Sequence, residues 1–214
     1  MTAGLVYRIG STLYVALTNR CNAVTLPATR GPGFAITGAS GFQPLADGCE
    51  PSAQAVAEAV RTAEAELKFD EVCFAGVGEP LLRLRELESA ARLIANARGQ
   101  GRLRINTNGL VVGSEAADVA RRLKSAGIGS ASVALATADK DQYEELMKPH
   151  PLRYSPSFSL SIGHEEVVGF CTALVEAGLA VECTAVAAPG VDVEAVEKLA
   201  LQLGATFRSR KYFA

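Results

Sequence analysis

EVCFAGVGEP, residues 71–80, reads as a short buried strand that passes directly into a glycine-rich loop. We predict the strand over 71–74, because a short apolar run bounded by turn residues is typical of a strand in the middle of a sheet. The loop over 75–82 leads to a helix predicted from about 85 to 97. A strand, a loop and a helix in this order form the repeating unit of a parallel sheet.

The same alternation extends in both directions along the chain. Upstream, a β-rich run at 12–17 can pair with 5–8, and a long loop over 18–50 then leads to an Ala-rich helix over 51–67. Downstream, the chain continues with strands at 103–106, 132–136, 180–186 and 206–208 and helices at 115–125, 140–147, 165–177 and 193–203. This pattern predicts an α/β fold with a parallel sheet and outer helices, in one domain over residues 1–214. An open, partial barrel and a doubly wound sheet both satisfy it.

The composition favours a folded protein and argues against two classes of partner. Hydrophobic residues make up 49% of the 214 residues and charged residues 21%, which is enough apolar material for a core. The formal net charge is -2 and no tract of Lys or Arg occurs, so we expect no nucleic-acid partner. No apolar stretch approaches the ~20 residues that span a bilayer, and residues 1–20 lack the apolar core of a secretory signal. We expect a cytoplasmic protein with no membrane partner; an organellar location and the oligomeric state stay open.

Three predicted strands end in polar or glycine residues, which are TNRC at 18–21, GVGEP at 76–80 and NTNG at 106–109. Because the carboxyl ends of parallel strands lie at the same edge of a sheet, we expect these three segments to converge on one site. Gly76 and Gly78 would let the backbone approach the amino and carboxylate groups of a ligand. Plain turns between a strand and a helix account for the same residues, and both interpretations stay open.

In this order and at these spacings, the segments resemble the radical S-adenosylmethionine (radical SAM) superfamily, in particular its TatD-associated subgroup. The resemblance covers nearly the whole chain and rests on the segments Tyr7-Arg8-Ile9-Gly10, Leu13-Tyr14-Val15, Leu17-Thr18-Asn19-Arg20-Cys21, Gly78-Glu79-Pro80-Leu81-Leu82-Arg83, Ile105-Asn106-Thr107-Asn108-Gly109-Leu110, 143–149, Pro189-Gly190-Val191-Asp192 and Phe207-Arg208-Ser209-Arg210-Lys211-Tyr212. It implies a partial (β/α)6 TIM-like barrel that binds a small molecule, S-adenosylmethionine. In such a barrel the glycine loop holds the amino group of the cofactor, and the polar end of the next strand lies beside it. Carried over to this chain, the cofactor-binding positions are Gly76, Gly78, Glu79, Pro80, Asn106, Thr107 and Asn108.

The defining motif of the family, CxxxCxxC, is reduced here to one cysteine. Three thiolates of that motif hold a [4Fe–4S] cluster in the family, and the corresponding residues of this chain are Cys21, Thr25 and Ala28. Iron–sulfur clusters demand thiolate ligands, which a Thr hydroxyl replaces poorly and an Ala methyl cannot replace. Cys49 would still leave a ligand short, and Cys73 lies in a predicted strand and is expected in the core. We therefore expect a degenerate iron–sulfur site, with Cys21 as a remnant ligand and no [4Fe–4S] cluster.

Three functions stay open on the sequence alone. The leading one is a pseudoenzyme or repurposed barrel that keeps a remnant cleft for S-adenosylmethionine or a related nucleoside. The second is an active radical SAM enzyme with non-standard cluster ligation. The third is a non-redox enzyme or an interaction module on the same barrel, with Glu79 and Asp139 as acid/base candidates and Cys21 as a nucleophile.

Four further polar residues lie at predicted strand or helix ends. Arg208 and Arg210, in the last strand, would bind an anionic group if they face the barrel mouth, because arginine matches carboxylate and phosphate geometry. A plain surface position for both arginines fits the sequence equally well. His150 and His164 are expected to be solvated or to cap helices.

Overall fold

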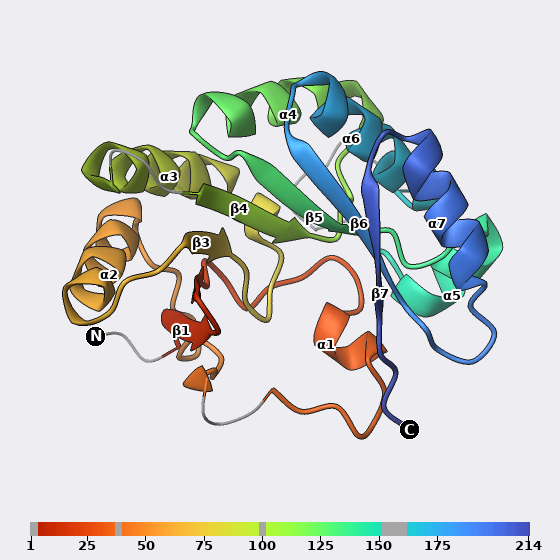
Figure 1. Cartoon of the computed structure of the whole chain (residues 1–214), viewed down its shortest axis with the longest axis horizontal. Helices are drawn as coiled ribbons and strands as arrows, with labels where there is room; N and C mark the ends of the chain where they lie inside the picture. Colours follow the sequence, from red (N-terminus) through yellow and green to blue (C-terminus); the bar gives the residue numbers. More distant parts are fainter. Residues whose placement is uncertain (1–3, 37–39, 99–101, 151–161) are drawn as a thin grey trace.

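The structure, a computed structural model, describes residues 4–36, 40–98, 102–150 and 162–214. Within these ranges one sheet holds seven strands in the order in which they occur in the chain (Figure 1). They are β1 (Val6–Ile9), β2 (Thr12–Val15), β3 (Glu71–Phe74), β4 (Arg102–Thr107), β5 (Ser130–Ala134), β6 (Ala180–Val186) and β7 (Thr206–Arg210). The strands from β2 to β7 are parallel, and β1 pairs antiparallel with β2. In the described residues β1 and β7 are the two edges, so the sheet is open.

The helices surround the sheet unevenly. In the described residues they are α1 (Leu26–Thr29), α2 (Ala53–Glu66), α3 (Leu84–Arg98), α4 (Ala116–Ser125), α5 (Lys140–Met147), α6 (His164–Glu176) and α7 (Val193–Gln202), with short 3-10 turns η2 (Pro80–Arg83) and η3 (Gly113–Glu115). The helices α2, α3, α4, α6 and α7 follow one another around the outer face of the sheet, whereas α1 lies on the inner side (Figure 1). None of the helices in the described ranges combines the length and the apolar character that crossing a bilayer requires.

The outer helices bury one apolar face against the sheet. In α3, the buried residues Leu87, Ala90, Ala91 and Ile94 recur at the spacing that places them on one side of a helix. They join a continuous core that includes Ile105 of β4. Burying one large aliphatic side chain contributes about 1.5–3 kcal/mol, so this layer accounts for much of the stabilisation of the fold.

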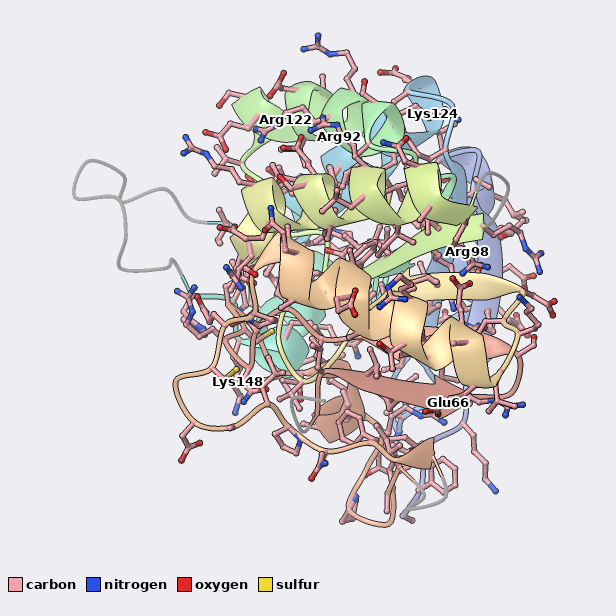
Figure 2. The ribbon with its side chains drawn as sticks, turned by 90° about the vertical axis from the view of Figure 1, so that its left-hand side faces the viewer. Glu66, Arg92, Arg98, Arg122, Lys124 and Lys148 are labelled. Carbon is pink, nitrogen blue, oxygen red and sulfur yellow. The ribbon has the colours of Figure 1, made fainter. Side chains whose placement is uncertain are left out.

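Ion pairs connect neighbouring outer helices. Figure 2 shows α2 and α3 side by side, with the labelled arginines Arg98 and Arg122 on the helical layer. Arg98 Nη1 lies 3.1 Å from Glu64 Oε1 and so joins α3 to α2. Arg122 Nε and Nη2 donate to the two carboxylate oxygens of Glu88 at 2.8 and 2.9 Å and so join α4 to α3. Two parallel hydrogen bonds of this kind fix orientation as well as distance.

The predicted partial barrel is confirmed, with six parallel strands and an antiparallel partner for the first of them. The bounds of β2, β5 and β7 differ by two residues from the sequence expectation, and the loop before α2 holds a helix that was not predicted. The strand β5 begins at Ser130, two residues before the predicted start, because Ser130 pairs with Arg104 and Ala180 although serine has a low strand propensity. The loop predicted over 18–50 contains the short helix α1, whose first turn holds Pro27. Residues 151–161 of the predicted irregular segment lie outside the described ranges.

Candidate functional site

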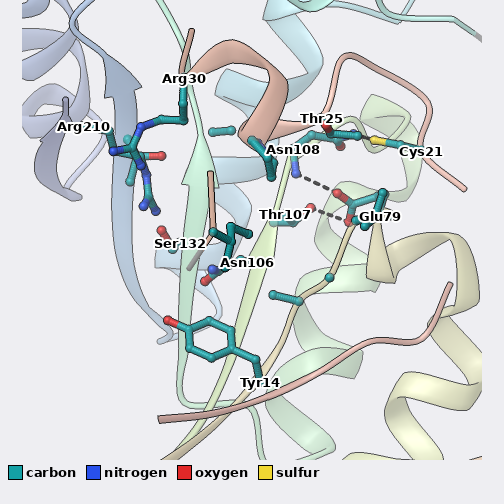
Figure 3. Close-up of a pocket in the computed structure, with 18 of the residues that line it drawn as sticks. Tyr14, Cys21, Thr25, Arg30, Glu79, Asn106, Thr107, Asn108, Ser132 and Arg210 are labelled. Atoms are coloured by element: carbon teal, nitrogen blue, oxygen red, sulfur yellow. Dashed lines mark hydrogen bonds between the residues drawn. The ribbon is translucent and has the colours of Figure 1, made fainter. Parts of the chain in front are cut away.

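A cavity of about 330 Å³ lies at the carboxyl ends of the parallel strands. It is lined by residues from the predicted strand ends, from β5 to β7 and from the loop that contains α1. Pockets for small molecules in proteins range over roughly 300–1,000 Å³, so the cavity has the size of a ligand site. Figure 3 shows Cys21 and Glu79 at one side of this cavity and Arg30 and Arg210 at the other.

Glu79 joins the three predicted strand ends. Its carboxylate accepts hydrogen bonds from Thr107 Oγ1 at 2.8 Å, from the Asn108 amide at 2.7 Å and from the Leu81 amide at 3.0 Å. Its own amide donates to the Arg20 carbonyl at 2.8 Å. Burial raises the pKa of the Glu79 carboxyl to about 7, although the hydrogen bonds from Asn108, Leu81 and Thr107 act to lower it. The side chain is therefore a buried clamp within the protein.

Gly76 and Gly78 lack side chains at points where the chain approaches itself. A Cβ on Gly78 would collide with the carbonyl oxygens of Thr18 and Arg20, and a Cβ on Gly76 would lie 2.8 Å from Ala16 Cβ. The Gly78 amide also donates to the Thr18 carbonyl at 3.2 Å. The sequence pattern linked these glycines to a ligand, whereas their closest approach is to the segment after β2.

The loop nevertheless keeps unused acceptors beside the cavity. Gly76, Val77 and Gly78 line it, and their carbonyl oxygens accept no hydrogen bond from the described residues. These three residues are half-buried, and their oxygens are acceptors that an ammonium group of a ligand could use. Pro80, the fourth residue predicted here, begins η2 and is buried without lining the cavity.

Asn106 differs from the two residues that follow it. Its side-chain oxygen Oδ1 accepts from Cys73 Sγ at 3.4 Å and from Arg104. Its side-chain nitrogen Nδ2 makes no hydrogen bond in the described part of the chain. Thr107 and Asn108 are buried and bind the Glu79 carboxylate instead. All three residues line the cavity, and Asn106 is the one with a donor to spare.

Cys21 lies in a network that keeps its thiol protonated. Asn108 Nδ2 donates to Asn22 Oδ1 at 2.7 Å and lies 3.8 Å from Cys21 Sγ. Burial raises the pKa of the Cys21 thiol and the Glu79 carboxylate raises it further, against hydrogen bonds from Ala23, Asn108 and Asn22. Since the thiolate is the form that attacks electrophiles and binds metals, this setting does not activate Cys21.

The two positions that the family resemblance assigns to the other motif cysteines have separate surroundings. Thr25 is the residue before α1 and lines the cavity, but its side chain makes no capping hydrogen bond. Ala28 is exposed on α1 and does not line the cavity. Ala28, which the resemblance assigns to the third thiolate, therefore carries no ligand atom and lies outside the cavity that Cys21 and Thr25 share.

The remaining cysteines do not supply the missing ligands. Cys73 is buried in β3, as expected, and Cys171 Sγ lies 3.7 Å from Cys183 Sγ in the core. Cys49 is half-buried and does not line the cavity. No group of three His, Cys, Asp or Glu side chains in the described ranges could hold a metal ion. The residues present do not fit a [4Fe–4S] cluster, which takes its ligands from several thiolates.

Two other predicted roles find no support in the geometry. Asp139 accepts a hydrogen bond from the Gln142 amide at 2.7 Å as the N-cap of α5 and does not line the cavity, so it does not share a site with Glu79. His164 was expected to be solvated or capping, and this expectation is wrong because the ring is buried. Its Nε2 lies 2.9 Å from the Thr137 carbonyl.

Three arginines line the cavity, and two of them were candidates from the sequence. Arg208 and Arg210 come from β7, at the cavity rather than on a plain outer surface. Arg30, just after α1, is the third. Its Nε donates to the Lys211 carbonyl across 181 residues of sequence, a separation that no local pattern reveals.

Comparison with known proteins identifies a family for most of the chain. A family model described as "Radical SAM superfamily" matches residues 47–203. None of the curated proteins compared with the chain matches it significantly.

Several solved structures share the fold. SuiB from Streptococcus suis has a TM-score of 0.66 and 16% identity over 96% of this chain and 40% of its own. HydG, a maturase of the [FeFe]-hydrogenase, has a TM-score of 0.62 and 15% identity over 94% of this chain and 42% of its own. TsrM from Kitasatospora setae, a radical S-adenosylmethionine methyltransferase solved with tryptophan and a SAM analog, has a TM-score of 0.59 and 14% identity over 95% of this chain and 36% of its own. The chain thus spans less than half the length of each of these proteins, and identities this low establish the fold alone.

Proposed function

The chain belongs to the radical SAM superfamily, and from this premise we propose that it is a TatD-associated descendant that has lost the [4Fe–4S] cluster site and keeps a cleft for S-adenosylmethionine or a related nucleoside. Residues 1–214 then form one domain, and the protein acts as a pseudoenzyme or as a barrel put to a new use. The single observation that carries the proposal is the supply of thiols, because Cys21 is the one cysteine among the residues that line the cavity.

The thiol supply favours a binding protein over a radical enzyme. The chemistry that makes a radical from S-adenosylmethionine belongs to the cluster and the cofactor together. Cys21 offers one sulfur, kept protonated by its surroundings, and Thr25 and Ala28 offer none. A chain with these residues does not hold the electron source that the reaction requires.

The case for a retained ligand cleft rests on atoms without partners in the described residues. The carbonyl oxygens of Gly76, Val77 and Gly78 are free acceptors for the amino group of a ligand, and Asn106 Nδ2 is a free donor in the lining of the same cavity. Gly76, Gly78, Glu79, Asn106, Thr107 and Asn108 would hold S-adenosylmethionine there, with Glu79 acting by fixing the loop rather than by touching the ligand. Pro80 would act in the same indirect way, since it begins the turn that follows.

Calorimetry with S-adenosylmethionine tests the binding half of the proposal. Thr25→Phe places a ring in the cavity without removing a capping hydrogen bond, since the Thr25 hydroxyl makes none, and we expect it to abolish most of the binding heat. Ala55→Phe adds the same ring on an exposed position of α2 and should bind as the wild type does. No heat from the wild-type protein at millimolar ligand would remove this half of the proposal.

Anaerobic reconstitution with iron and sulfide tests the other half. We expect wild-type protein to retain iron well below the complement of a full cluster and to show no cluster absorbance after desalting. Protein that retains a redox-active cluster, loses it in Cys21→Ser and cleaves S-adenosylmethionine reductively would establish instead an active enzyme with non-standard ligation.

A further inference from the structure

The side of the cavity away from Cys21 and Glu79 gathers positive charge from two distant parts of the chain (Figure 3). We call Arg30, Arg208 and Arg210 the arginine group. Arg208 and Arg210 alternate with Ser209 on β7, so both arginines lie on the same face of the sheet.

Arg30 is held against β7 by several contacts. Its Nε donates to the Lys211 carbonyl at 2.7 Å, and its own carbonyl accepts from the Phe213 amide at 2.8 Å. The guanidinium lies 4.6 Å from the ring centroid of Phe34 and 5.4 Å from that of Phe213. Cation–π contacts of this kind fix the plane of a guanidinium without neutralising its charge.

The arginine group carries more positive charge than the protein neutralises. Arg208 Nη2 pairs with Glu182 Oε1 at 2.7 Å, whereas neither Arg30 nor Arg210 forms an ion pair with a carboxylate in the described residues. Three guanidinium groups against one carboxylate leave a formal excess of two positive charges. Residues 1–3, 37–39, 99–101 and 151–161 contain no Asp or Glu, so none of them adds a carboxylate to the arginine group.

Arg210 is the member that the fold leaves least satisfied. Its Nε is buried and has no hydrogen-bond partner in the described part of the chain. Burial lowers the pKa of Arg210 to about 10, and the charges of Arg208 and Arg30 add to this effect while Glu182 opposes it. A buried donor without a partner costs stability, and a neighbouring like charge adds to that cost. A side chain such as Arg210, which lowers the stability of the folded protein, is typical of a binding site.

We propose that the arginine group binds a phosphoryl group of a small ligand that enters the cavity. A phosphoryl group carries close to two negative charges at neutral pH, which matches the excess of two, and arginine binds its oxygens through paired hydrogen bonds. The Asn106 amide nitrogen adds a neutral donor to the same cavity. S-adenosylmethionine carries one carboxylate beside a sulfonium and an ammonium, so it is a net cation and supplies one of the two negative charges that would balance this side of the cavity. The inference therefore stands independently of the proposed function.

The test measures protection of the folded protein by inorganic phosphate. In thermal unfolding at constant ionic strength, we expect phosphate to raise the Tm of the wild type, and Arg210→Gln to weaken the apparent affinity about tenfold or more. Arg210→Lys, which keeps the charge but not the paired donors, should retain part of the response. Arg85→Gln, which removes an exposed arginine of α3 outside the cavity, is the matched control and should respond as the wild type does.

The expected results distinguish a specific phosphoryl site from general stabilisation by anions. Arg210→Gln should itself be at least as stable as the wild type without phosphate, because it removes a buried, unpaired charge. A wild type that phosphate does not stabilise, or an Arg210→Gln variant that responds as fully as the wild type, would overturn the inference. Succinate is compared at the same ionic strength, and equal or stronger stabilisation by succinate would overturn the assignment to a phosphoryl group.

S-adenosylmethionine is titrated separately into the same variants. If phosphate protection fails while S-adenosylmethionine binds, the arginine inference is wrong and the proposed function stands. If phosphate protection depends on Arg210 while S-adenosylmethionine gives no heat, the arginine inference stands and the binding half of the proposed function is wrong.

Discussion

A single carboxylate holds together the strand ends that form one side of the cavity. Glu79 receives hydrogen bonds from Thr107, Asn108 and Leu81, yet its pKa is raised to about 7 by burial. The sequence marked Glu79 as part of a ligand loop but did not reveal that its side chain turns to the protein, because two of the donors come from the end of the next strand. Arg30 was missed altogether, since nothing local indicates its contact with the residues after β7.

The raised pKa of Glu79 gives a pH signature to the stability of the protein. A carboxyl whose pKa rises from 4.5 in the unfolded chain to about 7 on folding stabilises the folded state most below 4.5. That contribution falls as the pH rises and is lost above about 7, with a slope of up to about 1.4 kcal/mol per pH unit. We expect the free energy of unfolding of the wild type, relative to Glu79→Gln, to decrease from pH 5 to pH 7 and then to level off. Urea unfolding of both proteins across this pH range measures the difference in their free energies of unfolding. A difference that does not change with pH would contradict the raised pKa of Glu79.

At the scale of elements, the loop between β3 and η2 contributes residues 75–79 to the lining of the cavity. Its strand and its glycines were predictable, because a short apolar run followed by GVGE has few other interpretations. The helix α1 and the first two residues of β5 were not, since four residues with a proline and a serine-alanine pair give weak local signals. Tertiary contacts, rather than propensity, form both of these pieces.

Substitution of Gly78 tests whether close packing of this loop is required. Gly78→Ala places a methyl group against the carbonyl oxygens of Thr18 and Arg20, and we expect a loss of about 1–3 kcal/mol in the free energy of unfolding. Gly169→Ala is the control, because Gly169 lies on an exposed position of α6 with nothing within 4 Å of the added methyl. It should stabilise the protein by about 0.5–1 kcal/mol through helix propensity. Equal effects of the two substitutions in chemical denaturation would rule out the packing argument.

At the scale of the whole molecule, one continuous core runs beneath all the parallel strands. The alternation of strands and helices was enough to predict this architecture, because each unit must bury the same face against the same sheet. The sequence left open whether the sheet forms a partial barrel or a doubly wound layer. That choice depends on which face each connection crosses, and the outer position of α2, α3, α4 and α7 settles it (Figure 1).

A shared core predicts that distant core residues affect the same unfolding transition. Val72 in β3 and Val133 in β5 are both fully buried, and replacing either with Ala should cost on the order of 2 kcal/mol. If residues 1–214 form one domain, each variant shifts a single transition, with circular dichroism and tyrosine fluorescence changing together. Two transitions that respond separately to Val72→Ala and Val133→Ala would divide the chain into two units.

The contact of Arg30 with Lys211 and Phe213 brings an early part of the chain and a late part to the same side of the cavity. The strands from β2 to β6 pair without residues 211–213, whereas the arginine side of the cavity needs them to hold Arg30. A chain that stops short of β7 would have a sheet without a finished pocket. The anion binding that we propose at the arginine group therefore requires a chain that extends through residue 213.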